Sequence, residues 1–278
     1  MKSIPLQRGP NMTIRSKLHI AAALLAALAL FADSAAAVQV GAWQFDGNLN
    51  NAVPGKAPMA VFGGWAETYT SATINGSPAT VLSFPALTSS QALQMPNQAG
   101  ANGGGSLTNA WSIVMDVNFP VLTGFASFWQ TDQTISANDG DFFVRGNNDG
   151  IGIGGNYHGA IAQDTWNRVA VAVQPSGGSY LLDKYINGVL VGSTTSGTPL
   201  DGRHAVGAVL NLFTDEDGET AAGLVNSLAY YNTALSANDI GLLGGPTAAG
   251  VPAVPEPASA ALAVGGLSLL GLLRRRLR

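Results

Sequence analysis

The densest group of side chains able to do chemistry lies late in the chain, at Asp215-Glu216-Asp217-Gly218-Glu219. If this backbone is extended, Asp215, Asp217 and Glu219 project to one face, because alternate residues of a strand share a face. Three converging carboxylates suit a hard cation such as calcium, which takes about six to eight oxygen ligands. The spacing therefore predicts a calcium site at these three residues. A solvated acidic turn is the alternative, and Gly218 favours it.

Two other patterns bear on catalysis. The run from Gly150 to Gly155 satisfies G-x-G-x-x-G, but the residues after it do not predict the helix that a dinucleotide site needs, so we interpret it as a glycine-rich strand. His158 and His204 are the only histidines after residue 37, and no G-x-S-x-G turn accompanies them. We therefore expect both histidines to be exposed polar loop residues. The chain has no cysteine, which excludes disulfides, thiolate metal sites and cysteine nucleophiles.

Aromatic side chains can stack on sugar rings as well as fill a core. Trp43, Trp111 and Trp166 lie within strand patterns, and we assign them to the core. Four other aromatic residues lie near predicted turns or strand ends: Trp65, Tyr69, Trp129 and Tyr157. We predict that these four contact a ligand, and we assign no catalytic residue.

Short β-strands must position these residues. Only 11% of the chain is charged, against about 25% in a typical globular protein, and the 35 glycines argue against a helical fold. No window from residue 38 to 232 sustains a helical period, whereas short β-rich runs alternate with turn residues, as in a sandwich. We read 96–110 and 131–140 as long loops. The predicted strands are 38–45, 80–84, 111–119, 125–130, 141–145, 166–174, 180–186, 189–194, 208–213 and 224–231.

Local signals fix two pieces of this arrangement. Asn187-Gly188 suits a type I′ turn, which needs positive φ at both central residues, so residues 166–194 are predicted to form a three-stranded meander. One helix is expected near the end of the sandwich. Ser236 can cap it and Asp239 completes a capping box, while Gly244 can end it.

Three motifs carry a resemblance to a known family. They are Trp166-Asn167-Arg168-Val169-Ala170, Tyr185-Ile186-Asn187-Gly188 and the run from Tyr230 to Ser236. Together they resemble the LamG-like, concanavalin A-type family, with its tryptophan-started strand, its aromatic-x-Asn-Gly hairpin and its final strand leading into a capped helix. The resemblance covers roughly 38–245 and implies an all-β fold, an antiparallel jelly-roll β-sandwich.

The N-terminal 37 residues have the pattern of a secretory signal peptide. Four basic residues precede an apolar run over 20–31, and Ala35-Ala36-Ala37 provides an A-x-A ending. We expect the export machinery to recognise 1–37 and cleavage to follow Ala37. The long basic region leaves open whether translation starts at Met1 or Met12.

The C-terminal end carries the pattern of a second targeting signal. Pro255-Glu256-Pro257 precedes an apolar run over 258–273, and an arginine cluster follows it: Arg274, Arg275 and Arg276, then Arg278. Arginines behind an apolar helix stay cytoplasmic, so the main body is expected outside. The tripartite order over 254–278 resembles the PEP-CTERM sorting signal of Gram-negative bacteria. That resemblance implies a transient inner-membrane helix, processing near Glu256 by an exosortase, and delivery to the cell surface or extracellular matrix. Residues 246–253 would form a linker.

The exported body is strongly acidic. Residues 38–257 hold five basic and sixteen acidic side chains, a net charge of −11, which repels nucleic acid and attracts cations. The alternation at Asp215, Asp217 and Glu219 also resembles the catalytic strand of laminarinase-like glycoside hydrolases. That pattern starts with a glutamate nucleophile, whereas Asp215 is one methylene shorter, and retaining enzymes need two carboxyls about 5–5.5 Å apart.

These observations predict a non-catalytic exported protein that binds carbohydrate or extracellular polysaccharide, or serves in adhesion. The alternatives are a laminarinase-like hydrolase and a purely structural matrix protein. Fold alone does not choose among the three, because each uses a sandwich of this kind. The ligand and the oligomeric state stay open at this point.

Overall fold

The structure is a computed structural model that describes residues 37–137, 140–146 and 150–254. The predicted signal peptide, apart from Ala37, and the predicted sorting signal from Pro255 onward lie outside these residues. Within the described ranges, no helix is both long and apolar enough to cross a membrane.

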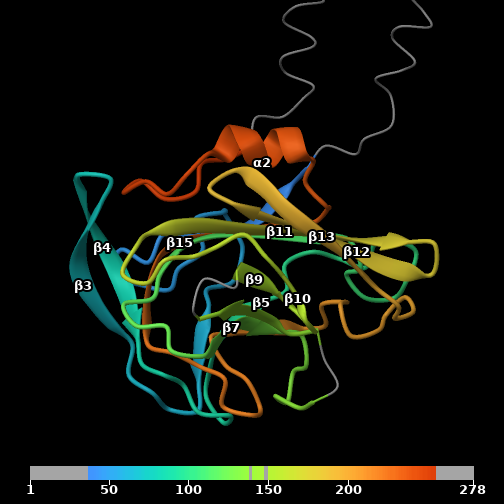
Figure 1. Ribbon diagram of the computed structural model, residues 1–278, viewed down its shortest axis with the longest axis horizontal. Helices are drawn as coiled ribbons and strands as arrows, with labels where there is room; N and C mark the ends of the chain where they lie inside the picture. The colour runs from blue at the N-terminus through green and yellow to red at the C-terminus, as the bar shows by residue number, and fades with distance from the viewer. Residues whose placement is uncertain (1–36, 138–139, 147–149, 255–278) are drawn as a thin grey trace, which may run out of the picture. The chain divides into compact units, whose positions relative to one another are not determined.

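Two antiparallel sheets pack face to face, which confirms the predicted β-sandwich (Figure 1). Sheet A has the order β13 (Val189–Ser196), β12 (Ser179–Ile186), β11 (Asn167–Ser176), β6 (Trp111–Asn118), β15 (Gly223–Tyr231), β4 (Ser77–Phe84) and β3 (Thr68–Ile74), with β1 (Gln39–Trp43) also paired to β15. Sheet B has the order β10 (Asn156–His158), β9 (Gly150–Ile153), β8 (Phe142–Arg145), β7 (Phe125–Gln130), β14 (Val209–Leu212), β5 (Ala92–Pro96) and β2 (Ala60–Phe62).

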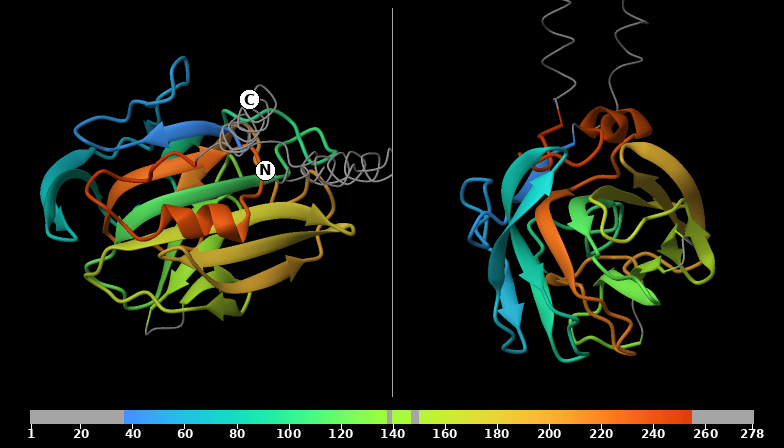
Figure 2. Two further views of the ribbon diagram at one scale, coloured as in Figure 1. Left: turned by 90° about the horizontal axis from the view of Figure 1, so that it is seen from above. Right: turned by 60° about the vertical axis from the view of Figure 1, so that its left-hand side comes forward.

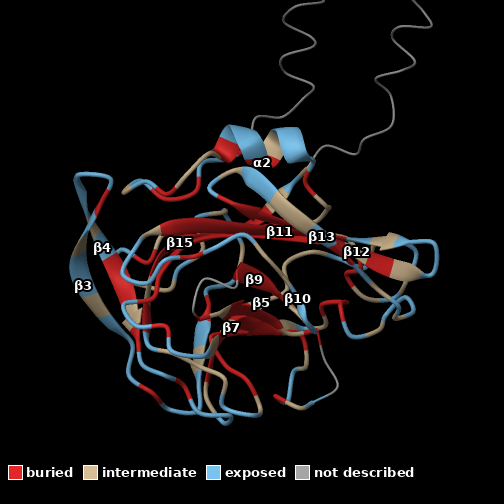
Figure 3. Cartoon of the chain, viewed as in Figure 1, coloured by how far each residue is buried: buried red, intermediate tan, exposed pale blue. Residues whose placement is uncertain are grey.

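The central strands of sheet A are covered on both faces. Every residue of β6 is buried, including the polar Ser112, Asp116 and Asn118, and the neighbouring strands β15 and β11 are mostly red in Figure 3. One face of β6 packs on sheet B through Trp111, Ile113 and Met115. The other face packs beneath a second apolar cluster that includes Val114 and the helix residues Ile240 and Leu243. The sandwich therefore has a third layer over sheet A.

That third layer begins with helix α2 (Ala237–Leu243). The Ser236 side chain accepts the Asp239 N–H, and the Asp239 carboxylate accepts the Ser236 N–H, so the predicted capping box is confirmed. Gly244 follows the helix with a φ of 64°, a left-handed conformation that favours glycine. The predicted helix and its two end signals are therefore correct.

Residues 244–254, which we call the C-terminal strap, pack onto sheet A, so the predicted free linker over 246–253 is wrong. Val251 and Val254 are buried in the second apolar cluster. Beneath the strap, Arg168 forms a bidentate ion pair with Asp116, with N–O distances of 2.7 and 2.8 Å. The same guanidinium donates to the carbonyls of Leu243 and Gly250. The folded unit thus continues to Val254, beyond the expected boundary at 245.

The predicted meander is confirmed, whereas several short strands were missed. Asn187 and Gly188 have φ values of 52° and 82°, as a type I′ turn requires. The glycine-rich strand interpreted from Gly150 onward is present as β9, whereas the missed strands, β2, β3, β5 and β10, are short or rich in serine and threonine. Long loops occupy much of 97–110 and of the described residues 131–137, as expected.

A seam closes one side of the sandwich, where edge strand β13 of sheet A meets edge strand β10 of sheet B. Lys184 of β12 is fully buried at this seam, and its ammonium donates to the Asn156 carbonyl at 2.7 Å and to Thr194 Oγ1 at 2.6 Å. Gly192 lies against the His158 ring, where a Cβ atom would come within 2.4 Å of a ring carbon. Close approach of the two sheet edges therefore requires glycine at position 192.

Candidate functional site

A hollow of about 400 Å³ lies beside the seam, and we call it the acidic hollow. Its walls come from the start of β8, the β9–β10 hairpin, the end of β13 and the loop that follows β14. Five of its side chains are carboxylates: Asp141, Asp215, Glu216, Asp217 and Glu219. The hollow also contains Tyr157, Arg203 and His204, so residues distant in sequence meet here.

The acidic run at 215–219 forms a turn rather than an extended strand. Asp215 is 2% exposed, and its Oδ2 accepts the N–H groups of Asp217 at 3.0 Å and Glu219 at 3.1 Å. Gly218 has a φ of 79° and donates its N–H to the Asp215 carbonyl. The expectation that Asp215, Asp217 and Glu219 share one strand face is therefore wrong. The alternative of a solvated acidic turn is correct for the turn but not for the solvation of Asp215, which is buried.

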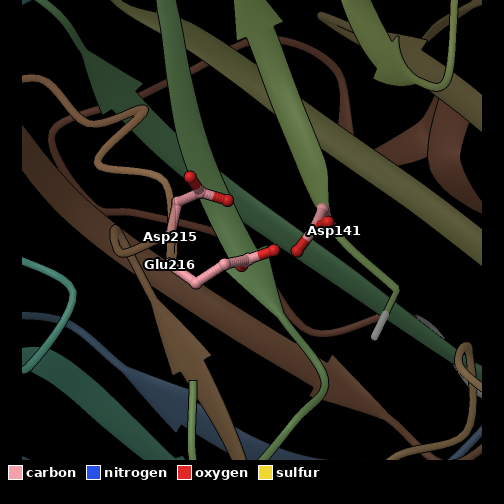
Figure 4. Close-up of side chains that lie close together, drawn as sticks. All are labelled: Asp141, Asp215 and Glu216. Atoms are coloured by element: carbon pink, nitrogen blue, oxygen red, sulfur yellow. The ribbon is translucent and has the colours of Figure 1, made fainter. Parts of the chain in front are cut away.

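The closest carboxylates differ from the predicted set. Oxygens of Asp141, Asp215 and Glu216 all lie within 4.8 Å of one another, and Figure 4 shows the three side chains converging. Asp217 and Glu219 line the same hollow outside this group. The sequence pattern missed Asp141, which lies at the start of β8, and Glu216, which an alternating pattern assigns to the opposite face. The turn at 215–219 brings Glu216 to Asp215, and the order of strands in sheet B brings Asp141 there.

Burial and the neighbouring charges weaken the acidity of two carboxyl groups of the hollow, Glu216 and Glu219. The pKa of Glu216 is raised, mainly by burial and then by the charges of Asp215 and Asp217. The pKa of Glu219 is raised in the same way, by burial first and then by the neighbouring carboxylates. Oε2 of Glu216 is buried and accepts no hydrogen bond within the described residues. An oxygen with no donor, close to two other carboxylates, fits a hard cation.

Tyr157 and His204 form part of the wall of the hollow. The Tyr157 ring lies 5.6 Å from the Phe125 ring centroid and 5.2 Å below the Arg145 guanidinium carbon, contacts that fix its orientation. Burial raises the pKa of Tyr157 to about 12. His204 is 3% exposed and its Nε2 lies 2.8 Å from Ser196 Oγ. The expectation that both histidines are exposed loop residues is therefore wrong, since His158 lies in strand β10 and is half-buried.

The four predicted ligand-contact aromatics do not come together. Trp129 is 1% exposed and stacks on Phe142 at 4.6 Å, and Trp65 is buried with its Nε1 donating to the Ala92 carbonyl. These two belong to the core because both lie between the sheets, so a ligand does not reach them. Tyr69 is half-buried on β3, at the far edge of sheet A from β13. Of the four, only Tyr157 lines the acidic hollow.

The tryptophans assigned to the core divide differently from the prediction. Trp43 and Trp111 are buried as expected. Trp166 is half-buried and precedes β11 instead of lying within it. The position of a tryptophan relative to a predicted strand therefore does not reliably predict how far its side chain is buried.

Comparison with known proteins identifies the fold. Residues 105–241 match the Laminin_G_3 family, described as the concanavalin A-like lectin/glucanases superfamily. Domain 4 of AbnA, a GH43 extracellular arabinanase from Geobacillus stearothermophilus solved in complex with arabinotriose, is similar in structure. The TM-score is 0.51 at 19% identity, over 76% of this chain and 100% of that domain. No curated protein shows significant sequence similarity to the chain.

Two toxin binding domains are more distant in structure. The binding domain of Paraclostridial Mosquitocidal Protein 1 gives a TM-score of 0.49 at 10% identity, over 74% of this chain and 51% of that one. The receptor-binding domain of botulinum neurotoxin type G gives 0.47 at 12% identity, over 73% and 50%. The chain therefore spans about half of each toxin domain. Taken together with the two sheets, the family match establishes a concanavalin A-like jelly roll, a fold that serves both binding and hydrolysis.

Proposed function

We propose that this protein is an exported, non-catalytic carbohydrate-binding module that acts at the cell surface or in an extracellular matrix. The observation that carries the proposal is the acidic hollow, where three carboxylates converge beside an oriented tyrosine ring. Carbohydrate sites commonly pair a flat aromatic surface with a few well-placed polar groups. The arabinotriose-bound arabinanase domain has the same fold and supports a sugar ligand.

Calcium is the cation that we propose for Asp141, Asp215 and Glu216. Their oxygens are close enough to share one ion, and the orphaned Glu216 oxygen lacks any other donor among the described residues. A bound calcium ion would neutralise the cluster and offer open coordination positions to hydroxyl oxygens. Two other residues that line the hollow would contact the sugar. Tyr157 would pack against it with its ring, and Arg203 would donate a hydrogen bond.

A glycoside hydrolase is the second candidate. Glu216 and Glu219 have raised pKa values, which is the property that a general acid needs. Against this reading, Asp215, Asp217 and Glu219 lie in a turn and do not repeat the strand alternation of laminarinase-like enzymes. A purely structural matrix role is the third possibility, and the absence of any sugar binding would support it.

Export and sorting complete the proposal. The signal peptide over 1–37 and the PEP-CTERM-like segment over 254–278 support transit through the inner membrane of a Gram-negative bacterium and release by an exosortase-like enzyme. The body has a net charge of −11, which suits a soluble surface protein and disfavours nucleic acid as a partner. Extracellular polysaccharide is then the ligand class that the protein would meet.

A glycan array tests the binding function. Residues 38–254, which include the strap, are probed with calcium and again with a chelator. We expect binding to neutral oligosaccharides that the chelator abolishes and that Glu216→Gln weakens at least tenfold. Glu67→Gln removes one exposed carboxylate outside the hollow and serves as the matched control.

An assay of reducing-sugar release on the bound glycans separates binding from hydrolysis. Binding without release supports the module. Release that Glu216→Gln or Glu219→Gln abolishes would instead establish a hydrolase, and no binding at all would leave the structural role.

A further inference from the structure

Strand β3 is the long open edge of the sandwich. It pairs with β4 alone, and it forms the outer margin of sheet A in Figure 1 and in the left view of Figure 2. The other edges are shorter or covered. Edge strand β13 meets β10 at the seam. The loop after β1 covers that strand, because the Ala52 N–H donates to the Ala42 carbonyl, and edge strand β2 has only three residues.

The register shows which backbone groups of β3 point outward. Asn75 and Gly76 have φ values of 47° and 80° and join Ile74 directly to Ser77 in a two-residue type I′ turn. In such a hairpin the flanking pair exchanges both hydrogen bonds, and hydrogen-bonded pairs then recur at every second residue. Ile74, Ala72 and Thr70 therefore face β4. The N–H and C=O groups of Tyr69, Ser71 and Thr73 point away from it, and no backbone bond within the described residues reaches them.

Much of this hairpin extends beyond the sheet. β4 pairs with β15 only through Leu82, Ser83 and Phe84, so the distal part of the hairpin is a two-stranded ribbon. The Asn75 side chain ties its tip to the Pro246 carbonyl at 2.7 Å. An isolated two-stranded ribbon is marginally stable in water, and a third strand would stabilise it.

The edge also lacks the features that keep natural edge strands apart. Such strands usually carry a lysine, a proline or a bulge. β3 has none of these, and its pairing with β4 shows no register shift. No residue from Thr68 to Phe84 is charged, although the exported body carries −11. The hairpin is therefore a surface on which two copies can approach without like charges meeting.

We propose that β3 is a homodimerisation edge, on which the β3 strand of a second copy of this chain pairs antiparallel across a two-fold axis. Centring the axis on Ser71 places Ser71 opposite its own copy and Tyr69 opposite Thr73 of the second copy. The outward N–H and C=O groups of both strands then satisfy one another. The side chains that meet are small or β-branched, apart from Tyr69, and β-branched and aromatic residues suit cross-strand pairs. The two copies of sheet A become one continuous sheet.

A cysteine trap tests the pairing directly, because the chain has no cysteine of its own. In the full-length protein, kept in mild detergent, Ser71→Cys is exposed to a gentle oxidant. The proposed axis places the two introduced cysteines opposite each other with Cα atoms about 5.5 Å apart, within the range of a disulfide. Ser176→Cys is the matched control, an exposed serine of β11 at the turn into β12.

We expect the Ser71→Cys protein to form a covalent dimer at least about tenfold faster than the Ser176→Cys protein, since pairing raises the effective thiol concentration. Equal rates would overturn the proposal. Both variants carry the same ends, so association through the ends contributes equally to each.

Sedimentation of the cysteine-free protein gives a second measurement. Ser71→Lys places two like charges directly opposite each other and should raise the dimer dissociation constant at least about tenfold, whereas Ser176→Lys should leave it unchanged. A wild-type protein that stays monomeric at all concentrations would also overturn the proposal. If Ser71→Lys fails to fold, as circular dichroism would show, the cysteine trap decides alone.

Discussion

The burial of His204 makes the stability of the fold depend on pH. Burial, and then the charge of Arg203, lowers the pKa of His204 from 6.5 to about 4. As the pH falls, the unfolded chain binds this proton first, so the free energy of unfolding decreases between pH 6.5 and pH 4. At about 1.4 kcal/mol for each pKa unit, the loss is about 3 kcal/mol. Urea unfolding at several pH values would measure it.

One substitution isolates that effect. His204→Gln should flatten the decrease, because glutamine does not titrate. Glu216 and Glu219 act in the opposite direction, since their raised pKa values let the folded state bind protons more tightly as the pH falls. A decrease that survives His204→Gln unchanged would show that another group is responsible.

The carboxylate cluster predicts stabilisation by calcium. An ion that binds only the folded state at about a hundredfold above its dissociation constant adds about 2.7 kcal/mol, which is a rise in Tm on the order of 5 °C for a domain of this size. Glu216→Gln or Asp141→Asn should remove most of the rise, and Glu67→Gln should keep it. Differential scanning calorimetry with calcium and with chelator measures the difference in Tm. Identical melting curves would contradict the proposed calcium site.

The residues of the acidic hollow show how much of the candidate site could be predicted from the sequence. Asp215, Asp217, Glu219 and Tyr157 all line the acidic hollow, so the residue types and the approximate place were predictable. The ligand geometry was not predictable, because it depends on the turn that Asp215 closes with the Asp217 N–H. It also depends on the approach of Asp141, which follows from sheet order and not from local spacing.

At the scale of elements, a buried ion pair helps to hold the C-terminal strap, because its Arg168 partner also donates to the Leu243 and Gly250 carbonyls. Arg168→Met would leave the Asp116 carboxylate buried without its partner, which typically costs 3–5 kcal/mol, and would release the carbonyls of Leu243 and Gly250. We expect proteases to cut within 244–254 in this variant and not in the wild type. Limited proteolysis with mass spectrometry would locate the cuts.

The double variant Arg168→Met/Asp116→Leu provides the control for that prediction. Replacing both charged partners by apolar side chains removes the unpaired charge, so the double variant should be more stable than Arg168→Met alone. A double variant that is less stable than the single one would contradict an energetic role for the pair.

The seam predicts a strict requirement for glycine. In Gly192→Ala the new Cβ would lie 2.4 Å from the His158 ring and 2.9 Å from His158 Cβ, so β10 and β13 must separate. Overpacking of this kind costs about 1–3 kcal/mol. Gly197→Ala, a glycine with open space around it, should be neutral. Thermal unfolding of the two variants tests the difference in stability. Equal Tm values would mean that β10 and β13 can separate without loss of stability.

Elements with local signals were predictable, and those that depend on distant partners were not. The Asn187-Gly188 turn and the Ser236 cap specify their conformations from neighbouring residues alone, and both are confirmed. β10 has only three residues, Asn156 to His158, and shows no hydrophobic alternation, so it was missed. The strap looks like a linker by composition, because its packing depends on Val251 and Val254 meeting the far side of sheet A.

At the scale of the whole folded unit, the described ends lie on one face. Ala37 and Val254 both pack at the cluster between sheet A and α2, the layer seen above the sheet in Figures 1 and 3. The acidic hollow opens instead beside the seam, between the edges of the two sheets. A protein held through its ends would therefore keep the acidic hollow apart from the face that carries the attachment.

The strap also bears on where the predicted sorting signal would be cleaved. A protease needs an extended, accessible backbone, and the chain is packed up to Val254, with Gly250 held by Arg168. Cleavage near Glu256 leaves that packing intact, whereas cleavage upstream would require the strap to detach. We expect mass spectrometry of the matrix-associated protein to find a C-terminus between residues 254 and 257. It should find neither Leu273 nor Arg278. The Arg168→Met variant should yield additional termini inside 244–254, because its strap is released. Full-length protein retained in the inner membrane would contradict the sorting prediction, and wild-type termini upstream of Gly250 would contradict the protection by the strap.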